Sequence, residues 1–116
     1  MLKFYGYKKC STCRKAEKAL AGLGREYAFI DITETPPSQA ELKAVLKRSG
    51  AEARKLFNTS GVQYKELKVK DKAPAMTEPQ VLSMLAGNGR LIKRPIVTDG
   101  TKATIGFGDE FLRAWK

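Results

Sequence analysis

Two cysteines separated by two residues, Cys10 and Cys13, constrain this chain more than any other feature of its sequence. The preceding segment, Leu2–Tyr7, is rich in aromatic residues with partial alternation, and it predicts a short β-strand. After Cys13, small and apolar residues recur at helical spacing until the glycines at positions 22 and 24 end the helix. Alternating residues over Glu26–Ile32 predict a second strand, so the chain opens with a βαβ unit. Its connection is right-handed if the two strands are parallel.

The middle of the chain carries the signals of helices rather than strands. Ser38, with Glu41 three residues later, is a capping box that predicts a helix stopping near Gly50. Thr77 begins another helix, which ends at the glycines of positions 87 and 89. Between these two helices, the sequence predicts a short helix over 51–57, a turn over 58–61 and a polar loop over 70–74, and the segment over 62–69 is ambiguous.

The last quarter of the chain returns to strand signals. Pro95 leads into the apolar pair Ile96–Val97, Asp99–Gly100 is typical of a hairpin turn, and Lys102–Phe107 is the predicted return strand. Asp109 then caps a final helix. Because no linker or repeat interrupts the sequence, we expect one α/β domain over residues 1–116. A helical insertion over approximately residues 36–90 separates its βαβ start from its C-terminal β-hairpin and helix.

The counts of cysteine and histidine narrow the chemistry of the cysteine pair. The chain has two cysteines and no histidine, which removes Cys–His catalysis and leaves too few ligands for a structural zinc site. A secreted disulfide scaffold would carry more cysteines, spaced further apart. The remaining chemistry is that of a thiolate assisted by arginine, lysine and backbone amides.

The formal net charge of +10 suits an oxyanion, an acidic protein or a nucleic acid as partner, or a solvated lysine-rich surface. The basic residues are scattered and form no DNA-binding arm, so we expect no direct DNA binding. No apolar run is long enough to span a bilayer, and the N-terminus has no secretory pattern. These features predict a cytoplasmic protein that makes no membrane contact.

The position of Cys10 just before a helix predicts a reactive thiol. Unpaired backbone N–H groups and the positive end of the helix dipole favour the thiolate, which is the nucleophilic form of cysteine. Ser11 and Thr12 are good capping residues at the same helix start. Nearby basic residues should add to the lowering of the Cys10 pKa: these are Lys8, Lys9, Arg14 and Lys15.

Cys13 lies one helical turn beyond Cys10, close enough to attack a mixed disulfide formed there. We therefore assign Cys10 as the nucleophile and Cys13 as the resolving thiol. Three alternatives remain open: inert core cysteines, metal binding shared with a second chain, and a chance CxxC without function. Polar, basic neighbours argue against burial of the pair, and its place in a βαβ unit favours the redox interpretation.

The dipeptide Arg94–Pro95 is a second candidate feature. A proline at a strand entrance restricts its neighbour, and a cis bond there marks a tight turn that often has a function. The alternative is an ordinary loop proline.

Several longer motifs together resemble one family. They are KKCSTCRKA after the first strand, PPS at residues 36–38, LFNTSGVQYKEL at residues 56–67 and LIKRPIV at residues 91–97. In this order they are similar to the ArsC/Spx family, which contains arsenate reductases and the regulators Spx and MgsR. The resemblance covers essentially the whole chain and is closest to an ArsC-like branch that carries the CxxC pair. It implies a thioredoxin-like fold with a helical insertion.

The resemblance also implies roles for single positions. Arsenate reductases of this type attack arsenate with a cysteine at the Cys10 position and hold it with three arginines. Arg94 matches one of these, while Asn58 and Phe107, or a neighbour of Phe107, occupy the other two positions. In thioredoxin-like folds a proline such as Pro95 faces the thiols. The Spx regulators share the cysteine pair, bind the α-subunit of RNA polymerase and switch through an intramolecular disulfide.

Together these arguments predict a thiol–disulfide redox protein that acts as an oxidoreductase. The expected catalytic residues are Cys10, Cys13 and Arg94, and the expected supporting residues are Ser11, Thr12, Arg14, Asn58 and Pro95. We expect no metal and no tightly bound cofactor, with glutathione as a candidate co-substrate and glutaredoxin or thioredoxin as candidate partners. Two alternatives stay open: an Spx-type regulator that binds RNA polymerase, and a glutathione- and glutaredoxin-dependent arsenate reductase.

Overall fold

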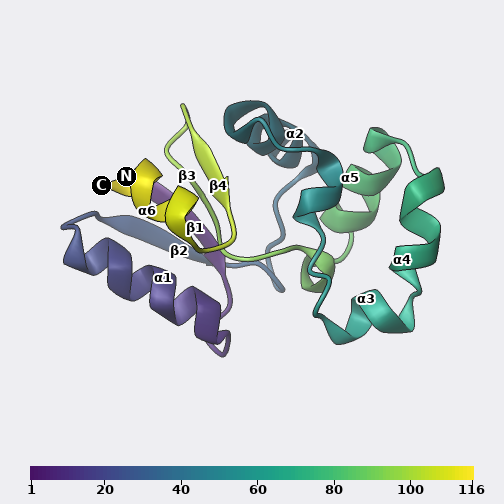
Figure 1. Ribbon diagram of the computed structural model, residues 1–116, viewed down its shortest axis with the longest axis horizontal. Coiled ribbons are helices and arrows are strands. Elements are labelled where there is room, and N and C mark those ends of the chain that lie inside the picture. Colours follow the sequence, from purple (N-terminus) through teal and green to yellow (C-terminus); the bar gives the residue numbers. More distant parts are fainter.

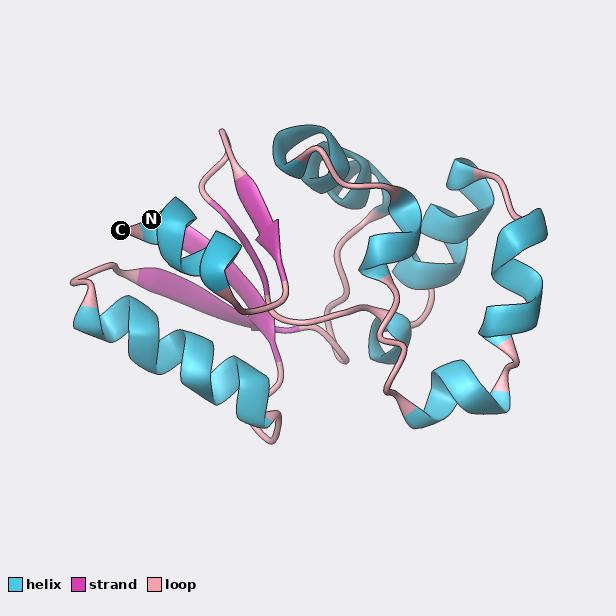
Figure 2. Ribbon diagram, viewed as in Figure 1, coloured by secondary structure: helices cyan, strands magenta, loops and turns pink.

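Four strands form one mixed sheet in the order β2–β1–β3–β4, in a computed structural model that describes residues 1–116 (Figures 1 and 2). The strands are β1 (Leu2–Gly6), β2 (Tyr27–Asp31), β3 (Ile96–Thr98) and β4 (Ala103–Ile105). β1 pairs in parallel with β2 and antiparallel with β3, and β3 pairs antiparallel with β4. β1 therefore lies between β2, the second strand of the βαβ unit, and the C-terminal hairpin formed by β3 and β4.

Helices cover both faces of this sheet. α1 (Ser11–Gly22) and α6 (Asp109–Trp115) pack on the face that carries Phe4 and Val97, together with the buried side chains of Leu20 and Trp115. The opposite face, with Tyr5 and Ile96, packs against the helical insertion in a second and larger core cluster. Two apolar cores on either side of one sheet give the α/β architecture that the sequence predicts.

All the regular elements of the insertion between β2 and β3 are helices, and the insertion extends away from the sheet, to the right in Figure 1. Its elements are α2 (Gln39–Ser49), η1 (Ala53–Leu56), α3 (Val62–Glu66), α4 (Val69–Lys72), η2 (Ala73–Ala75), α5 (Glu78–Ala86) and η3 (Gly89–Leu91). The ambiguous segment over 62–69 thus begins with a short helix. The predicted polar loop over 70–74 is wrong, because α4 and η2 occupy it and bury Val69 and Ala73 in the core.

The helix caps agree with the sequence patterns in part. Ser38 accepts a hydrogen bond from the N–H of Glu41, but the Glu41 carboxylate pairs with Arg48 at 3.6 Å instead of returning to the cap, so only one arm of the predicted capping box forms. A complete box is found at α5, between Thr77 and Gln80. Both caps satisfy backbone N–H groups that would otherwise lack partners.

A short pairing between two distant segments brings the insertion back to the sheet edge. Phe57 bridges Ile92, the Asn58 N–H donates to Leu91 O at 2.7 Å, and the Lys93 N–H donates to Leu56 O at 2.6 Å. The turn that begins at Asn58 is therefore fixed beside the segment that leads into β3. As a result, residues some 35 positions apart in sequence lie beside the start of α1.

Candidate functional site

Cys10 is itself the N-cap of α1. Its backbone is extended, with φ −87° and ψ 120°, and its Sγ accepts a hydrogen bond from the N–H of Cys13 at 3.4 Å. A cap of this kind normally presents an oxygen from Ser, Thr, Asn or Asp to the free N–H groups of the first turn. Here a sulfur takes that place, so the helix start stabilises a thiolate directly.

Several effects compete on the Cys10 thiol. Partial burial raises its pKa, whereas hydrogen bonding from Cys13 and the positive charge of Arg94 lower it, and the net effect is a lowered pKa. The lowered pKa agrees with the expectation from the sequence, but the positive charge that lowers it is that of Arg94 rather than those of the basic residues next to the cysteines in the chain. Lys8, one of the lysines expected to contribute, pairs with Glu17 at 3.1 Å and lies 4.1 Å from the centroid of the Phe29 ring.

Cys13 differs from Cys10 in almost every respect. Its side chain is fully buried, contrary to the expectation that polar neighbours would keep both cysteines out of the core. Burial, together with the hydrogen bond with Cys10 and the Cys10 charge, raises its pKa to about 12. The N–H of Tyr7 donates to its Sγ at 3.5 Å and acts in the opposite direction. In the reduced protein Cys10 therefore ionises more readily than Cys13, which has a pKa of about 12 and stays protonated near neutral pH.

Cys13 can occupy its buried position because Gly6, beside it on β1, has no side chain. A Cβ at Gly6 would lie 3.2 Å from the Cys13 Sγ and 2.5 Å from Cε1 of the Phe4 ring. A distance of 2.5 Å between two carbon atoms is not tolerated in a packed core. The close approach of β1 to the first turn of α1 thus depends on the absence of a side chain at this strand position.

Arg94 acts on both cysteines, since its positive charge lowers the pKa of each. The Arg94–Pro95 bond is cis, and Pro95 is buried at the entrance to β3. The Arg94 guanidinium carbon lies 5.3 Å from the centroid of the Tyr7 ring, a distance at which cation–π attraction operates. Tyr7 therefore supports both halves of the site, with its ring beside Arg94 and its N–H on Cys13.

A groove of about 490 Å³ opens over Cys10, and we call it the thiol groove. Its lining residues are Cys10, Thr12, Asn58, Ser60, Gly61, Val62, Lys93, Arg94, Gly106 and Phe107. A second hollow of about 390 Å³, which includes Tyr7 and Arg90, shares Asn58, Gly61, Val62 and Arg94 with it. The volume is in the range of a small-molecule or short-peptide site.

The structure brings only some of the candidate residues to this groove. Cys10, Thr12, Asn58 and Arg94 line it, whereas Ser11 and Arg14 are exposed residues of α1 outside the lining. Lys93 and Val62 in the thiol groove, and Tyr7 in the hollow beside it, were not predicted as site residues, although two of the family motifs include Lys93 and Val62.

The position of Lys93 in the groove depends on Gly106, which lies against its side chain. Gly106 has a positive φ of 85°, and a Cβ there would lie 2.9 Å from the Lys93 Cε. The aliphatic part of Lys93 thus packs against bare backbone while its ammonium group remains at the groove. Lys93 and Arg94 are the two cationic side chains that line the thiol groove.

A βαβ start, a cysteine pair at the first helix and a proline-entered strand beside it define a thioredoxin-like thiol protein. The chain belongs to the ArsC family, whose family model matches residues 5–115. Both statements confirm what the sequence motifs imply.

The relatives of this chain carry several different names. It is 51% identical to the uncharacterized protein YusI of Bacillus subtilis, over 98% of both chains. It is 30% identical to an arsenate reductase of Neisseria meningitidis, over 90% of this chain and 89% of that protein. It is 28% identical to the global transcriptional regulator Spx of Streptococcus pyogenes, over 91% of this chain and 78% of the regulator.

Solved structures agree with the architecture. An ArsC-family-related protein of Bacteroides fragilis superposes with a TM-score of 0.95 at 43% identity, over 99% of this chain and 97% of that one. An arsenate reductase of Vibrio cholerae superposes with a TM-score of 0.84 at 28% identity, over 99% and 97%. None of the helices in the structure has the length and apolar character to cross a membrane.

Proposed function

We propose that this protein is a thiol–disulfide oxidoreductase that uses Cys10 as nucleophile and Cys13 as resolving thiol. The asymmetry of the two thiols carries the proposal: one turn of α1 joins a half-buried cysteine of lowered pKa to a buried cysteine of pKa about 12. A pair with this asymmetry has one thiolate ready to attack and one protonated thiol that waits for the second step.

The reaction proceeds in two exchanges. The Cys10 thiolate attacks one sulfur of a substrate disulfide, whose other sulfur leaves as a thiolate and takes a proton. Cys13 then loses its proton and attacks the Cys10 Sγ, which releases the second substrate thiol and leaves a Cys10–Cys13 disulfide. The substrate disulfide gains two electrons and the cysteine pair loses two. A thiol donor, for which glutathione, glutaredoxin and thioredoxin are candidates, returns the pair to the dithiol.

The contacts of Cys13 provide a reason for this order. Two of the effects that raise its pKa are the hydrogen bond with Cys10 and the negative charge of the Cys10 thiolate. Both disappear when Cys10 is engaged in a mixed disulfide, while the Tyr7 N–H and the Arg94 charge continue to favour a Cys13 thiolate. Formation of the mixed disulfide therefore lowers the Cys13 pKa and promotes the second exchange.

Mass spectrometry of the reduced protein after exposure to oxidised glutathione tests this order. The wild-type chain should end without an adduct and with two hydrogens fewer, because Cys13 displaces the first glutathione. Cys13→Ser should keep one glutathione on Cys10, and Cys10→Ser should stay unmodified. A Cys10→Ser protein that reacts as fast as the wild type would overturn the assignment of the nucleophile.

A second candidate function rests on the similarity to Spx and on the same thiol pair. In a redox regulator the Cys10–Cys13 disulfide would change affinity for a partner, such as the α-subunit of RNA polymerase, without repeated turnover. Binding of the isolated C-terminal domain of the α-subunit to the reduced and oxidised chain separates the two functions. Redox-dependent binding, together with a lack of repeated turnover in the presence of glutathione, would favour the regulator over the enzyme.

A further inference from the structure

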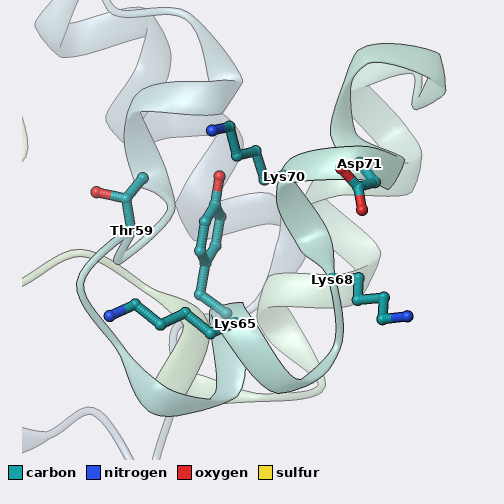
Figure 3. Close-up of a pocket in the computed structure, with 6 residues that line it drawn as sticks. Thr59, Lys65, Lys68, Lys70 and Asp71 are labelled. Carbon is teal, nitrogen blue, oxygen red and sulfur yellow. The ribbon is translucent and has the colours of Figure 1, made fainter.

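Another concave surface lies beside the thiol groove, lined by residues that neighbour the Asn58 turn in sequence. This lysine pocket, of about 570 Å³, is lined by Thr59, Tyr64, Lys65, Lys68, Lys70 and Asp71 (Figure 3). The segment 58–71 contributes to both hollows. Its residues Asn58, Ser60, Gly61 and Val62 form part of the thiol groove, and all six lining residues of the pocket come from the same segment. A molecule bound over this segment would contact both.

The lysines of the pocket are free to pair with an external anion. Lys65, Lys68 and Lys70 are exposed, and the two ion pairs of the protein involve other residues. Figure 3 shows the amines of Lys65 and Lys70 on the same side of the pocket as the Thr59 hydroxyl, with Lys68 directed to the opposite side. Asp71 is the single acidic lining residue, so positive charge prevails.

Exposed apolar side chains accompany these lysines. Val62 is 69% exposed and Leu67 is 40% exposed, which makes two of the five large exposed hydrophobic side chains in the protein members of one short segment. Val62 also lines the thiol groove. An apolar centre with a polar rim is the ordinary composition of a protein interface.

We propose that Val62, Leu67 and the lysine pocket form a docking surface for an acidic protein segment that carries the disulfide reduced at Cys10. The inference rests on the proposed oxidoreductase function and adds the kind of partner. Unpaired lysines attract a segment rich in Glu or Asp, and the shared turn places its reactive sulfur at the thiol groove. Charge of one sign on a concave surface raises association rates by about tenfold to a thousandfold at low salt.

Two peptides that differ only in charge can test this surface. Each has one central cysteine joined as a disulfide to thionitrobenzoate, with about ten flanking residues on each side rich in Glu or in the neutral isostere Gln. An extended flank of about ten residues spans roughly 33 Å, a large part of the 41 Å length of the protein. Attack by Cys10 and closure by Cys13 release thionitrobenzoate, whose absorbance gives the second-order rate constant.

The wild-type protein should react with the Glu peptide at least about tenfold faster than with the Gln peptide at low salt. The preference should shrink as ionic strength rises. The combined variant Lys65→Glu, Lys68→Glu and Lys70→Glu should abolish it. The matched control makes the same change of charge at exposed lysines of α1 and α2: Lys18→Glu, Lys43→Glu and Lys47→Glu. This control should keep most of the preference.

The outcomes that contradict the docking surface differ from the outcome that contradicts the oxidoreductase function. Equal rates of the wild type with the two peptides, or equal losses in the two triple variants, would overturn the docking surface. Inhibition by a single-stranded oligonucleotide at far lower concentration than by polyglutamate would also overturn it, in favour of a nucleic-acid site. Hydroxyethyl disulfide, which is small and neutral, should react equally with all three proteins. Its failure to react with the wild type would instead remove the underlying oxidoreductase function.

Discussion

Replacing Gly6 with alanine tests whether the close approach of β1 to α1 holds the resolving thiol in place. The new Cβ would lie 2.5 Å from the Phe4 ring and 3.2 Å from the Cys13 Sγ. The Phe4 ring cannot yield easily, because it is fully buried and its centroid lies 5.3 Å and 5.5 Å from those of Tyr27 and Phe29. The substitution must therefore displace the ring, the cysteine or the strand.

Overpacking of this kind typically costs about 1–3 kcal/mol. With an unfolding entropy of about 2.1 cal/mol/K per residue, a chain of this length loses roughly 4 °C in Tm for each kcal/mol. We expect Gly6→Ala to lower the Tm of the reduced protein by about 4–12 °C. Displacement of Cys13 should also slow closure of the Cys10–Cys13 disulfide, so that glutathione remains on Cys10 for longer.

Thermal unfolding followed by circular dichroism measures the first effect, and quenched mass spectrometry of the glutathione adduct measures the second. Gly22→Ala is the matched control, since a Cβ at Gly22 meets nothing within 4 Å. The last residue of α1 should tolerate alanine or gain slightly from it. A Gly6→Ala protein with the Tm and closure rate of the wild type would refute the steric argument.

The other predictions concern the charge, the specificity and the packing of the site and core. Arg94→Met should raise the Cys10 pKa, because a positive charge that favours the thiolate is lost, and iodoacetamide alkylation should then shift to higher pH. Asn58→Arg should lower the Kd for arsenate, measured by protection of Cys10 from alkylation, by roughly tenfold to a hundredfold, since one charge-assisted hydrogen bond contributes about 1.5–3 kcal/mol. Trp115→Phe should lower the Tm by several degrees, because the buried Thr104 hydroxyl loses the indole N–H that donates to it at 2.9 Å, a loss of about 1–3 kcal/mol.

Each of these changes has a control elsewhere on the surface. Arg14→Met removes a charge from α1 outside the groove lining and should leave the alkylation profile unchanged. Thr59→Arg adds a charge in the lysine pocket and should not strengthen arsenate binding. Leu112→Ala, on the exposed side of α6, should lower the Tm less than Trp115→Phe. A control that matches its test variant would contradict the corresponding argument.

Local patterns were sufficient for most elements of this fold. The helix between Ser38 and Gly50, for instance, has its start and stop signals within its own sequence, and the structure keeps both as caps. The prediction of a loop over 70–74 was wrong because the local sequence does not determine the structure of this segment. Its polar sequence looks like a loop, but burial of Val69 and Ala73 against the insertion core stabilises helical turns there. Tertiary packing often overrides local propensity in such short segments.

In the candidate site, too, local sequence identifies some residues, whereas tertiary contacts decide where they lie. Arg94 and Asn58 could be named as candidates from family motifs, but their approach to one groove depends on backbone pairing between residues 56–58 and 91–93. Lys93 lies within a family motif but was not predicted as a site residue, and its position depends on the bare backbone of Gly106 across the groove. Contacts between residues so far apart in sequence leave no periodic signal in either segment.

For the cysteine pair, the sequence by itself determined that two thiols stand one turn apart at the start of a helix, since spacing and capping are local properties. The place of Cys10 before the helix also indicated it as the nucleophile, but only the tertiary structure decided how strongly the two thiols differ in pKa. Burial beneath β1 raises the Cys13 pKa to about 12, while the helix N–H and the distant Arg94 charge lower that of Cys10. Desolvation and long-range charge depend on what the rest of the chain packs around a residue, and this is the physical reason why the two cysteines differ.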